Sequence, residues 1–268
     1  MYASNYLEEK VLNLMRGSSG ESFVAPASLQ LALFYSNPQE SGGEGTEASY
    51  QGYVRQPITF GAPQVSASDA TILTMSNDTV ISFPEAAAAG QSVAYVAVFD
   101  NQNNMLLYSV LNPALTIQAG VTPVFRAGSL KWTWSGNLST YYRTLVMNTI
   151  RGANASISAF NPWIGLYIGN PFSGGLEVSR SDYQRFAVTM GAPVQNETSG
   201  VARSVNIGDS DNVSVAAESN WGIITYFAMM DAQTNGNIFA AASLGTSYNM
   251  LAGSVAGFHP GDLEVTIN

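Results

Sequence analysis

The first seventeen residues show the spacing of an amphipathic helix. Asn5 is a helix-capping residue with Glu8 three positions later, and Gly17 is a residue type that commonly ends helices. Ser139 and Gly152 bracket a second segment of this kind. The apolar face of the first segment consists of Leu7, Val11, Leu14 and Met15. The pattern therefore predicts two short helices, one at the start of each half of the chain.

After the first helix, the chain changes to short runs of β-branched and aromatic residues separated by Gly, Pro, Asn and Ser. Two Asn-rich turns, one in each half of the chain, predict two β-hairpins, 92–99 with 105–110 and 223–230 with 238–242. The segment 39–49, in which glutamates alternate with glycines, is expected to be a mobile loop. The strands predicted in the first half are 29–35, 53–60, 79–83, 92–99, 105–110 and 130–134.

The sequence blocks of the first half return in the same order in the second half, at a spacing of roughly 130 to 135 residues. The clearest pair, 53–63 and 183–193, shares Tyr-x-Arg and Gly-Ala-Pro. Other pairs are 5–17 with 141–152, 31–38 with 164–171, 95–100 with 226–231 and 125–133 with 258–266. We therefore predict two domains, 1–136 and 137–268, that meet near Gly136.

Each repeat combines one opening helix with about six short strands and frequent turns. The predicted fold is mainly β, with two tandem antiparallel β-sandwich or barrel-like domains, each opening with a short α-helix. Charged residues make up only 11% of the chain, less than half of the roughly 25% of an ordinary soluble domain. The exposed surface must therefore consist largely of neutral polar residues, which suits proteins that contact other proteins.

The formal net charge of −9 argues against nucleic-acid binding, because such binding depends on Lys and Arg displacing counterions from phosphates. The sequence contains no run of about eighteen apolar residues that would predict a membrane span. The acidic start does not fit a signal peptide. We expect synthesis in a cytoplasm and no membrane association. The chain has no cysteine, so disulfides and thiolate chemistry are excluded.

Few residues in the chain are candidates for chemistry. His259, the single histidine, lies in a closing turn without a partner motif, and we interpret it as structural or incidental rather than catalytic. Asp100 and Asp231 occupy equivalent strand ends and could form an acid-base pair, but hydrogen bonding to the turn backbone is the simpler interpretation. Arg55 and Arg185 could bind an acidic partner, although pairing with a carboxylate of the chain is favoured.

Two further groups have a functional and a structural interpretation. Residues 208–212 contain oxygen ligands, but they lack the later Gly and Glu of an EF-hand loop, so a solvated turn is favoured. The tryptophans could stack on sugars, although core and interface packing is the default. They are Trp132, Trp134, Trp163 and Trp221. We therefore predict no catalytic, cofactor-binding or metal-binding residues.

The repeated blocks resemble a family of tailed-phage virion proteins that are often labelled tail fibre or structural protein. Its members share a short Asn-Tyr-Leu helix, an apolar strand, a Gly/Thr-Glu loop, Gly-Tyr-x-Arg-x-x-x-x-Phe-Gly, a strand ending in Asp and a Gly-Asp-Leu strand. The matching segments here are 5–17, 29–38, 43–47, 52–61, 92–100 and 261–267. The sequence departs from this pattern where Asp182 replaces the Gly before Tyr183, and where Ser129 replaces the Asp of Gly-Asp-Leu.

This resemblance implies a noncatalytic structural protein on the exterior of a phage virion. Because heptads and collagen-like runs are absent from the sequence, a capsid decoration or cement protein fits as well as a tail-fibre-like appendage. The implied partners are other virion proteins, in a homo-oligomer or a multi-copy assembly. The alternative is an adhesin module that binds a host-surface glycan, which would require exposed aromatic residues in a concave patch.

Overall fold

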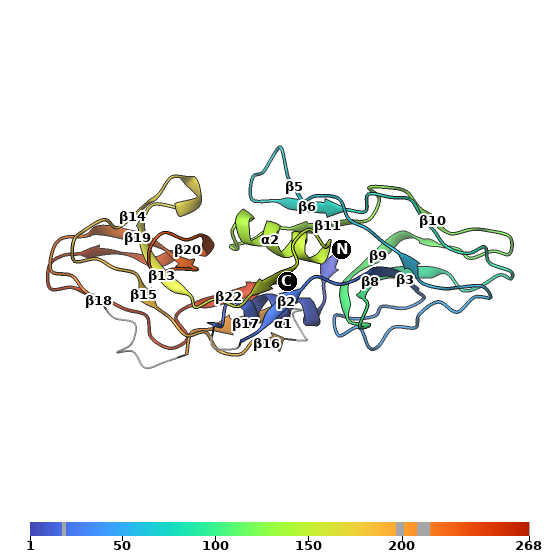
Figure 1. Cartoon of the computed structure of the whole chain (residues 1–268), viewed down its shortest axis with the longest axis horizontal. Coiled ribbons are helices and arrows are strands. Elements are labelled where there is room, and N and C mark those ends of the chain that lie inside the picture. Colours follow the sequence, from blue (N-terminus) through green and yellow to red (C-terminus); the bar gives the residue numbers. More distant parts are fainter. Residues whose placement is uncertain (18–19, 197–200, 208–214, 268) are drawn as a thin grey trace.

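The computed structural model describes residues 1–17, 20–196, 201–207 and 215–267. Within them lie the helices α1 (Asn5–Leu14) and α2 (Thr140–Ile150), a short 3-10 helix η2 (Pro171–Ser173), and many short strands. Figure 1 shows an elongated molecule with both α-helices near its middle and a β-sheet towards either end. The fold is mainly β, as the sequence pattern predicts.

The strands of the first repeat form three antiparallel groups. One sheet has the order β1-β9-β8-β3-β4, a second has the order β11-β6-β5, and β10 pairs with β7. The bounds are β1 (Tyr2–Ala3), β2 (Ser22–Val24), β3 (Leu29–Phe34), β4 (Gln56–Pro57), β5 (Gln64–Val65), β6 (Leu73–Ser76), β7 (Ile81–Ser82), β8 (Val93–Asp100), β9 (Met105–Leu115), β10 (Val124–Phe125) and β11 (Lys131–Trp134).

The second repeat has the same groups. Its large sheet joins β14, β13, β19 and β20 in this order, with β15 also paired to β13; β16-β17-β22 form the small sheet and β18 pairs with β21. The bounds are β12 (Ser156–Ser158), β13 (Trp163–Ile168), β14 (Leu176–Glu177), β15 (Phe186–Ala187), β16 (Val194–Asn196), β17 (Val201–Val205), β18 (Val215–Ala216), β19 (Gly222–Met230), β20 (Ile238–Met250), β21 (Val255–Ala256) and β22 (Glu264–Ile267). Among the described strands, no sheet closes into a barrel.

Both predicted hairpins are confirmed, as β8–β9 and β19–β20. The predicted strand 53–60 is wrong in extent, because only β4 pairs there and Phe60 makes an isolated bridge to Asn77. Tyr53 and Arg55 in this segment instead direct polar side chains to Glu47. The sequence pattern also missed several very short strands, such as β2, β5 and β6.

The loop 39–49 was expected to be mobile, but its second half is hydrogen-bonded along β3. The Tyr35 N–H donates to the Thr46 carbonyl at 2.8 Å, and the Ala48 N–H donates to the Leu33 carbonyl at 2.7 Å. These bonds satisfy backbone groups at the free edge of the strand. The segment is therefore part of the sheet edge rather than a detached loop.

The start of α1 also differs from the prediction. Ser4, not Asn5, is the N-cap, and its hydroxyl accepts a hydrogen bond from the Leu7 N–H at 3.3 Å. Glu8 does not close a capping box, because its side chain is buried with 1% exposure in contact with other elements. The predicted cap at Ser139 is confirmed for α2, where the hydroxyl accepts from the Tyr142 N–H at 3.0 Å. The predicted apolar face of α1 is confirmed, since its four residues are buried.

In the middle of the molecule, the helix of each repeat packs on strands of the other repeat. Helix α1 of the first repeat packs on β16, β17 and β22 of the second, whereas α2 packs on β6 of the first as well as on β12 and β20 of its own repeat. The strand after each helix pairs with its counterpart, so Phe23 of β2 lies opposite Ile157 of β12. One continuous hydrophobic cluster therefore includes residues from both repeats.

Candidate functional site

A cluster of polar side chains holds the edge of the large sheet in the first repeat. Arg55 forms a two-pronged ion pair with Glu47, with Nε to Oε1 at 2.8 Å and Nη2 to Oε2 at 2.7 Å. The Tyr53 hydroxyl donates to Glu47 at 2.8 Å and accepts from the Leu33 N–H of β3 at 3.0 Å. The remaining amino group of Arg55 donates to Asn103 in the β8–β9 turn at 2.6 Å. The cluster thus joins a loop, a strand and a hairpin turn.

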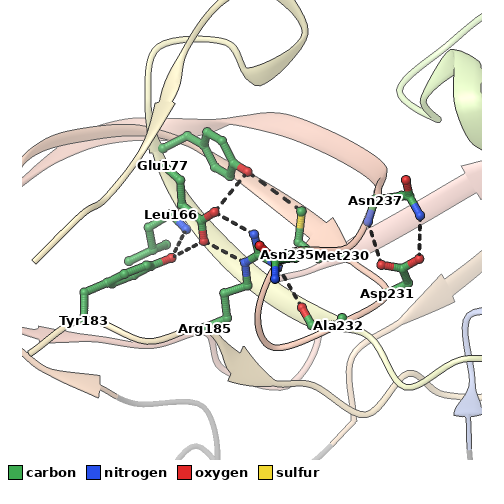
Figure 2. A network of polar contacts seen from close by, with 10 residues as sticks. Leu166, Glu177, Tyr183, Arg185, Met230, Asp231, Ala232, Asn235 and Asn237 are labelled. Atoms are coloured by element: carbon green, nitrogen blue, oxygen red, sulfur yellow. Dashed lines mark hydrogen bonds and ion pairs between the residues drawn. The ribbon is translucent and has the colours of Figure 1, made fainter. Parts of the chain in front are cut away.

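The second repeat builds the same cluster from equivalent residues, as Figure 2 shows. Arg185 binds both oxygens of Glu177 at 2.7 Å, and the Tyr183 hydroxyl donates to Glu177 at 3.1 Å. The Leu166 N–H donates to that hydroxyl at 2.9 Å. The other Arg185 amino group reaches carbonyl oxygens of the β19–β20 turn, those of Ala232 and Asn235. The predicted pairing of both arginines with carboxylates of the chain is therefore confirmed.

The electrostatics of the clusters favour fixed charges. Burial alone would raise the pKa of the Glu47 carboxyl, but hydrogen bonds from Arg55 and Tyr53 outweigh it and hold this pKa below its usual value. Burial raises the pKa of the Tyr53 and Tyr183 hydroxyls well above the usual range. Hydrogen bonding to Glu177 raises the pKa of Arg185. At neutral pH the Glu47–Arg55 pair is thus charged and the two tyrosines are neutral, which suits a structural clamp.

The two aspartates at the hairpin entrances hold their turns, as predicted. Asp100 accepts from the backbone N–H groups of Gln102 at 2.9 Å and Asn104 at 2.8 Å. Asp231 accepts from the backbone N–H of Asn237 at 2.6 Å and from its side-chain amide at 2.9 Å. The aspartates belong to different repeats and each is engaged by its own turn. The structure therefore does not bring them together as an acid-base pair.

His259 lies in an exposed closing turn whose main chain is held by asparagine. The Asn206 amide donates to the His259 carbonyl at 2.8 Å, and the Asn77 amide donates to the Arg126 carbonyl at 2.9 Å in the first repeat. The His259 N–H donates to the Asp262 carboxylate at 2.6 Å. His259 and Arg126 are therefore equivalent, in agreement with the predicted pairing of 125–133 with 258–266, because the carbonyl of each accepts a hydrogen bond from an asparagine amide.

The four tryptophans do not present an exposed stacking platform. Trp132, Trp134 and Trp221 are buried with 1–5% exposure, and Trp163 is half-buried. The rings of Trp132 and Trp134 stack with centroids 5.1 Å apart. The prediction of core packing is therefore confirmed for the three buried tryptophans.

Asp182, which departs from the family pattern, has a specific role in the second repeat. Its carboxylate accepts hydrogen bonds from the N–H groups of Glu218 and Ser219 and from the Trp221 indole at 2.7–2.9 Å. Burial would raise the pKa of this carboxyl, but these hydrogen bonds and that of the Ser219 hydroxyl lower it well below its usual range. Gly52, the equivalent residue in the first repeat, has a left-handed φ of 97° and no side chain to serve as such an acceptor.

Sequence reasoning missed two buried charges between the repeats. Glu8 and Arg143 occupy the same position, four residues after the capping serine of each helix, and each is only 1% exposed. Arg143 donates to the carbonyls of Thr71, at 2.6 Å, and of Trp134 in the first repeat. Neither oxygen of Glu8 has a hydrogen-bond partner within 3.5 Å among the described residues, although the Gln195 amide lies near enough to favour its charged form.

The glutamates of the two polar clusters were also missed, although the sequence carries a signal for them. In both repeats the order is Glu, five residues, Tyr, one residue, Arg, which begins at Glu47 and at Glu177. The spacing from Glu to Arg is thus the same in both copies, even though the loop before Glu is longer in the first. A repeated acid at a fixed distance from a repeated base indicates an ion pair.

The described residues contain no group of three or more His, Asp or Glu side chains able to hold a metal ion. The predicted solvated turn at 208–212 lies outside the described residues. Neither α1 nor α2 is long and apolar enough to cross a membrane.

Comparison with known proteins agrees with the internal duplication. The sequence model of the family described as "Podophage GP4 fiber I protein gp80" matches residues 2–133 and again residues 137–266. No curated protein matches the chain. The two matches cover nearly the whole length and coincide with the two structural repeats. The chain therefore belongs to this family of phage fibre proteins, as a tandem duplication.

Proposed function

We propose that this phage fibre protein is a noncatalytic component of the virion exterior, made in the host cytoplasm and assembled into a tail-fibre-like appendage. Its membership of a fibre family supports an appendage over a capsid decoration. We further propose that it associates with other virion proteins and is present as a homo-oligomer or in multiple copies. Neither nucleic acid nor membrane is a proposed partner.

The main support for this proposal is that the side chains best suited to chemistry are used in structural contacts. Arg55 and Arg185 are committed to two-pronged ion pairs, and Asp100 and Asp231 hold hairpin turns. The two-pronged ion pair and the turn held by an aspartate recur in both repeats. Side chains used in this way stabilise the shape of a protein, and a stable shape is what an assembly component requires.

The copy number of the chain per purified virion tests the proposal. Quantitative mass spectrometry against the major capsid protein should give a few to a few dozen copies, and immunogold labelling should place them on the tail. Hundreds of copies over the capsid surface would instead establish a decoration protein. Absence of the chain from purified particles would refute a virion role.

The adhesin alternative has its own test. The buried tryptophans remove the most obvious sugar-stacking platform. Purified protein applied to host cells and to a glycan array should therefore bind neither. Saturable binding that soluble host polysaccharide competes away would favour the adhesin interpretation.

A further inference from the structure

The second repeat contains a cavity of about 370 Å³ between its small sheet and its large sheet. Strand β22 contributes one wall through Leu263, Val265 and Ile267, and the opposite wall includes Met229 and Ala240. The segment 134–138, which joins the two repeats, forms a third side. All five named side chains are buried and apolar, whereas the neighbouring Asn137 is exposed.

The equivalent strands of the first repeat carry larger side chains at the positions that line this cavity. Leu130 and Leu263 are equivalent. The Leu130 N–H donates to the Asn77 side-chain oxygen at 2.9 Å, and the Leu263 N–H donates to that of Asn206 at the same distance. Two and four residues later, β11 carries Trp132 and Trp134, whereas β22 carries Val265 and Ile267. The four positions point inward, since β11 and β22 have the same alternation of buried and exposed residues. Two stacked indole rings are thus replaced by two small aliphatic side chains.

The wall provided by the large sheet becomes smaller at one position and larger at three, since Leu138 also replaces Ala3. Leu107 pairs with Ala3 in the first repeat, and Ala240 bridges Leu138 at the equivalent place in the second. The larger Phe227 and Met229 replace Val96 and Val98 and refill part of the space. A pocket nevertheless remains, with apolar side chains on its walls and polar residues at its open rim, as is typical of sites for small ligands.

We propose that this cavity binds a flat aromatic group of about the size of an indole ring. The matching framework of the first repeat accommodates indoles, and apolar cavities readily take up aromatic molecules of fitting size. Exposed polar residues at the rim, among them Asn137 and Thr266, would remain in contact with solvent. The group could be the side chain of a neighbouring protein or a free aromatic molecule. The inference does not rest on the proposed virion role.

The test uses the full chain and two probes, indole and N-acetyltryptophanamide, in calorimetric titrations and thermal unfolding. Indole should bind and raise the melting temperature. Ala240→Leu, which restores the residue of the first repeat, should weaken indole binding by about tenfold or more. Val265→Trp should abolish binding, and Thr133→Trp on the exposed face of β11 is the control that adds an indole without filling the cavity.

The two probes separate the possible sources of the ligand. Binding of both would point to a side chain of a partner, and binding of indole alone would point to a free molecule. Failure of indole to bind the unmodified protein would overturn the proposal. Equal binding to the unmodified protein and to Ala240→Leu would also overturn it, because the probe would then occupy another place.

Discussion

At the scale of single residues, Glu8 and Arg143 show how two copies of one sequence come to differ. The repeats meet through their helices, and the same helical position contacts the opposite repeat in each case. Arg143 donates there to the backbone carbonyls of Thr71 and Trp134, since a guanidinium can donate in several directions. Glu8 meets the Gln195 amide and the charge of Glu40, so its carboxylate is poorly compensated. Burial first, and then Glu40, raise the pKa of Glu8 to about 8.

This raised pKa predicts a pH dependence of stability. The folded protein keeps a proton that the unfolded chain, with an ordinary carboxyl pKa of 4.5, releases. The contribution of Glu8 is therefore complete below pH 4.5 and declines as the pH rises towards 8. Glu8→Gln should raise the free energy of unfolding by roughly 1–3 kcal/mol at pH 7.5 and change it little at pH 4.5.

Urea unfolding of both proteins between pH 4.5 and 8.5 measures this difference. Glu9→Gln is the matched control, since Glu9 is the exposed neighbour on the same helix. Tyr108, Glu40 and Gln195 face the same region and remain unchanged in both variants. A stability difference that does not vary with pH would show that folding does not raise the pKa of Glu8.

The ion pairs of the polar clusters give a second prediction at the residue scale. Arg185 is 9% exposed in its pair with Glu177, whereas Arg203 is 55% exposed in its pair with Glu264. Arg185→Ala leaves a half-buried carboxylate uncompensated and should cost about 2–4 kcal/mol. Arg203→Ala should cost less than about 1 kcal/mol. Denaturant unfolding measures both, and similar losses would contradict a structural role specific to the cluster.

At the scale of elements, the strand pair β2–β12 is the direct backbone connection between equivalent parts of the two repeats. Phe23 and Ile157 lie opposite each other, and each is buried in the shared core with 4–6% exposure. Val24, the next residue, is 63% exposed. A strand pair of this length has little stability alone, so its apolar face must supply it.

We therefore expect Phe23→Ala to destabilise the whole protein by about 3–5 kcal/mol. Val24→Ala should change the free energy of unfolding by less than about 0.5 kcal/mol. Thermal and urea unfolding should show one transition for Phe23→Ala, shifted as a whole, because the core is continuous. Two separate transitions would indicate repeats that unfold independently.

At the scale of the whole molecule, each repeat packs its helix against the other repeat, although the sequence separates into two consecutive copies. The range 1–136 contains α1 but lacks the sheet β16-β17-β22 on which that helix packs. The range 137–268 likewise lacks β6, which α2 contacts. Each predicted domain would thus expose an apolar helix face when produced alone.

Production of 1–136 and 137–268 as separate chains tests this dependence. Each should be aggregated or self-associated alone, and mixing during refolding should give a one-to-one complex with the circular dichroism of the intact protein. Size-exclusion chromatography with light scattering measures the outcome. A monomeric, cooperatively unfolding half would show that the predicted boundary separates independent domains.

Several features of this protein followed from the sequence by local physical rules. The runs of apolar, β-branched and aromatic residues at 92–99 and 105–110, joined by an Asn-rich turn, predicted a hairpin. The repeat of Tyr-x-Arg predicted equivalent positions. The capping residue of α1 was placed one position late, because Ser4 and Asn5 are both good caps. The very short strands were missed because two to four residues carry too little periodicity to identify a strand.

The sequence by itself determined the fold class, the duplication, the hairpins and the family, since these depend on local pattern and on order along the chain. Only the tertiary structure decided which repeat each helix packs on, the partners of Glu8 and Arg143, and the cavity beside Val265 and Ile267. Most of these features join residues that lie far apart along the chain, such as α1 with β17 and Arg143 with Thr71. Such contacts depend on how whole surfaces fit together, and no local pattern encodes that fit.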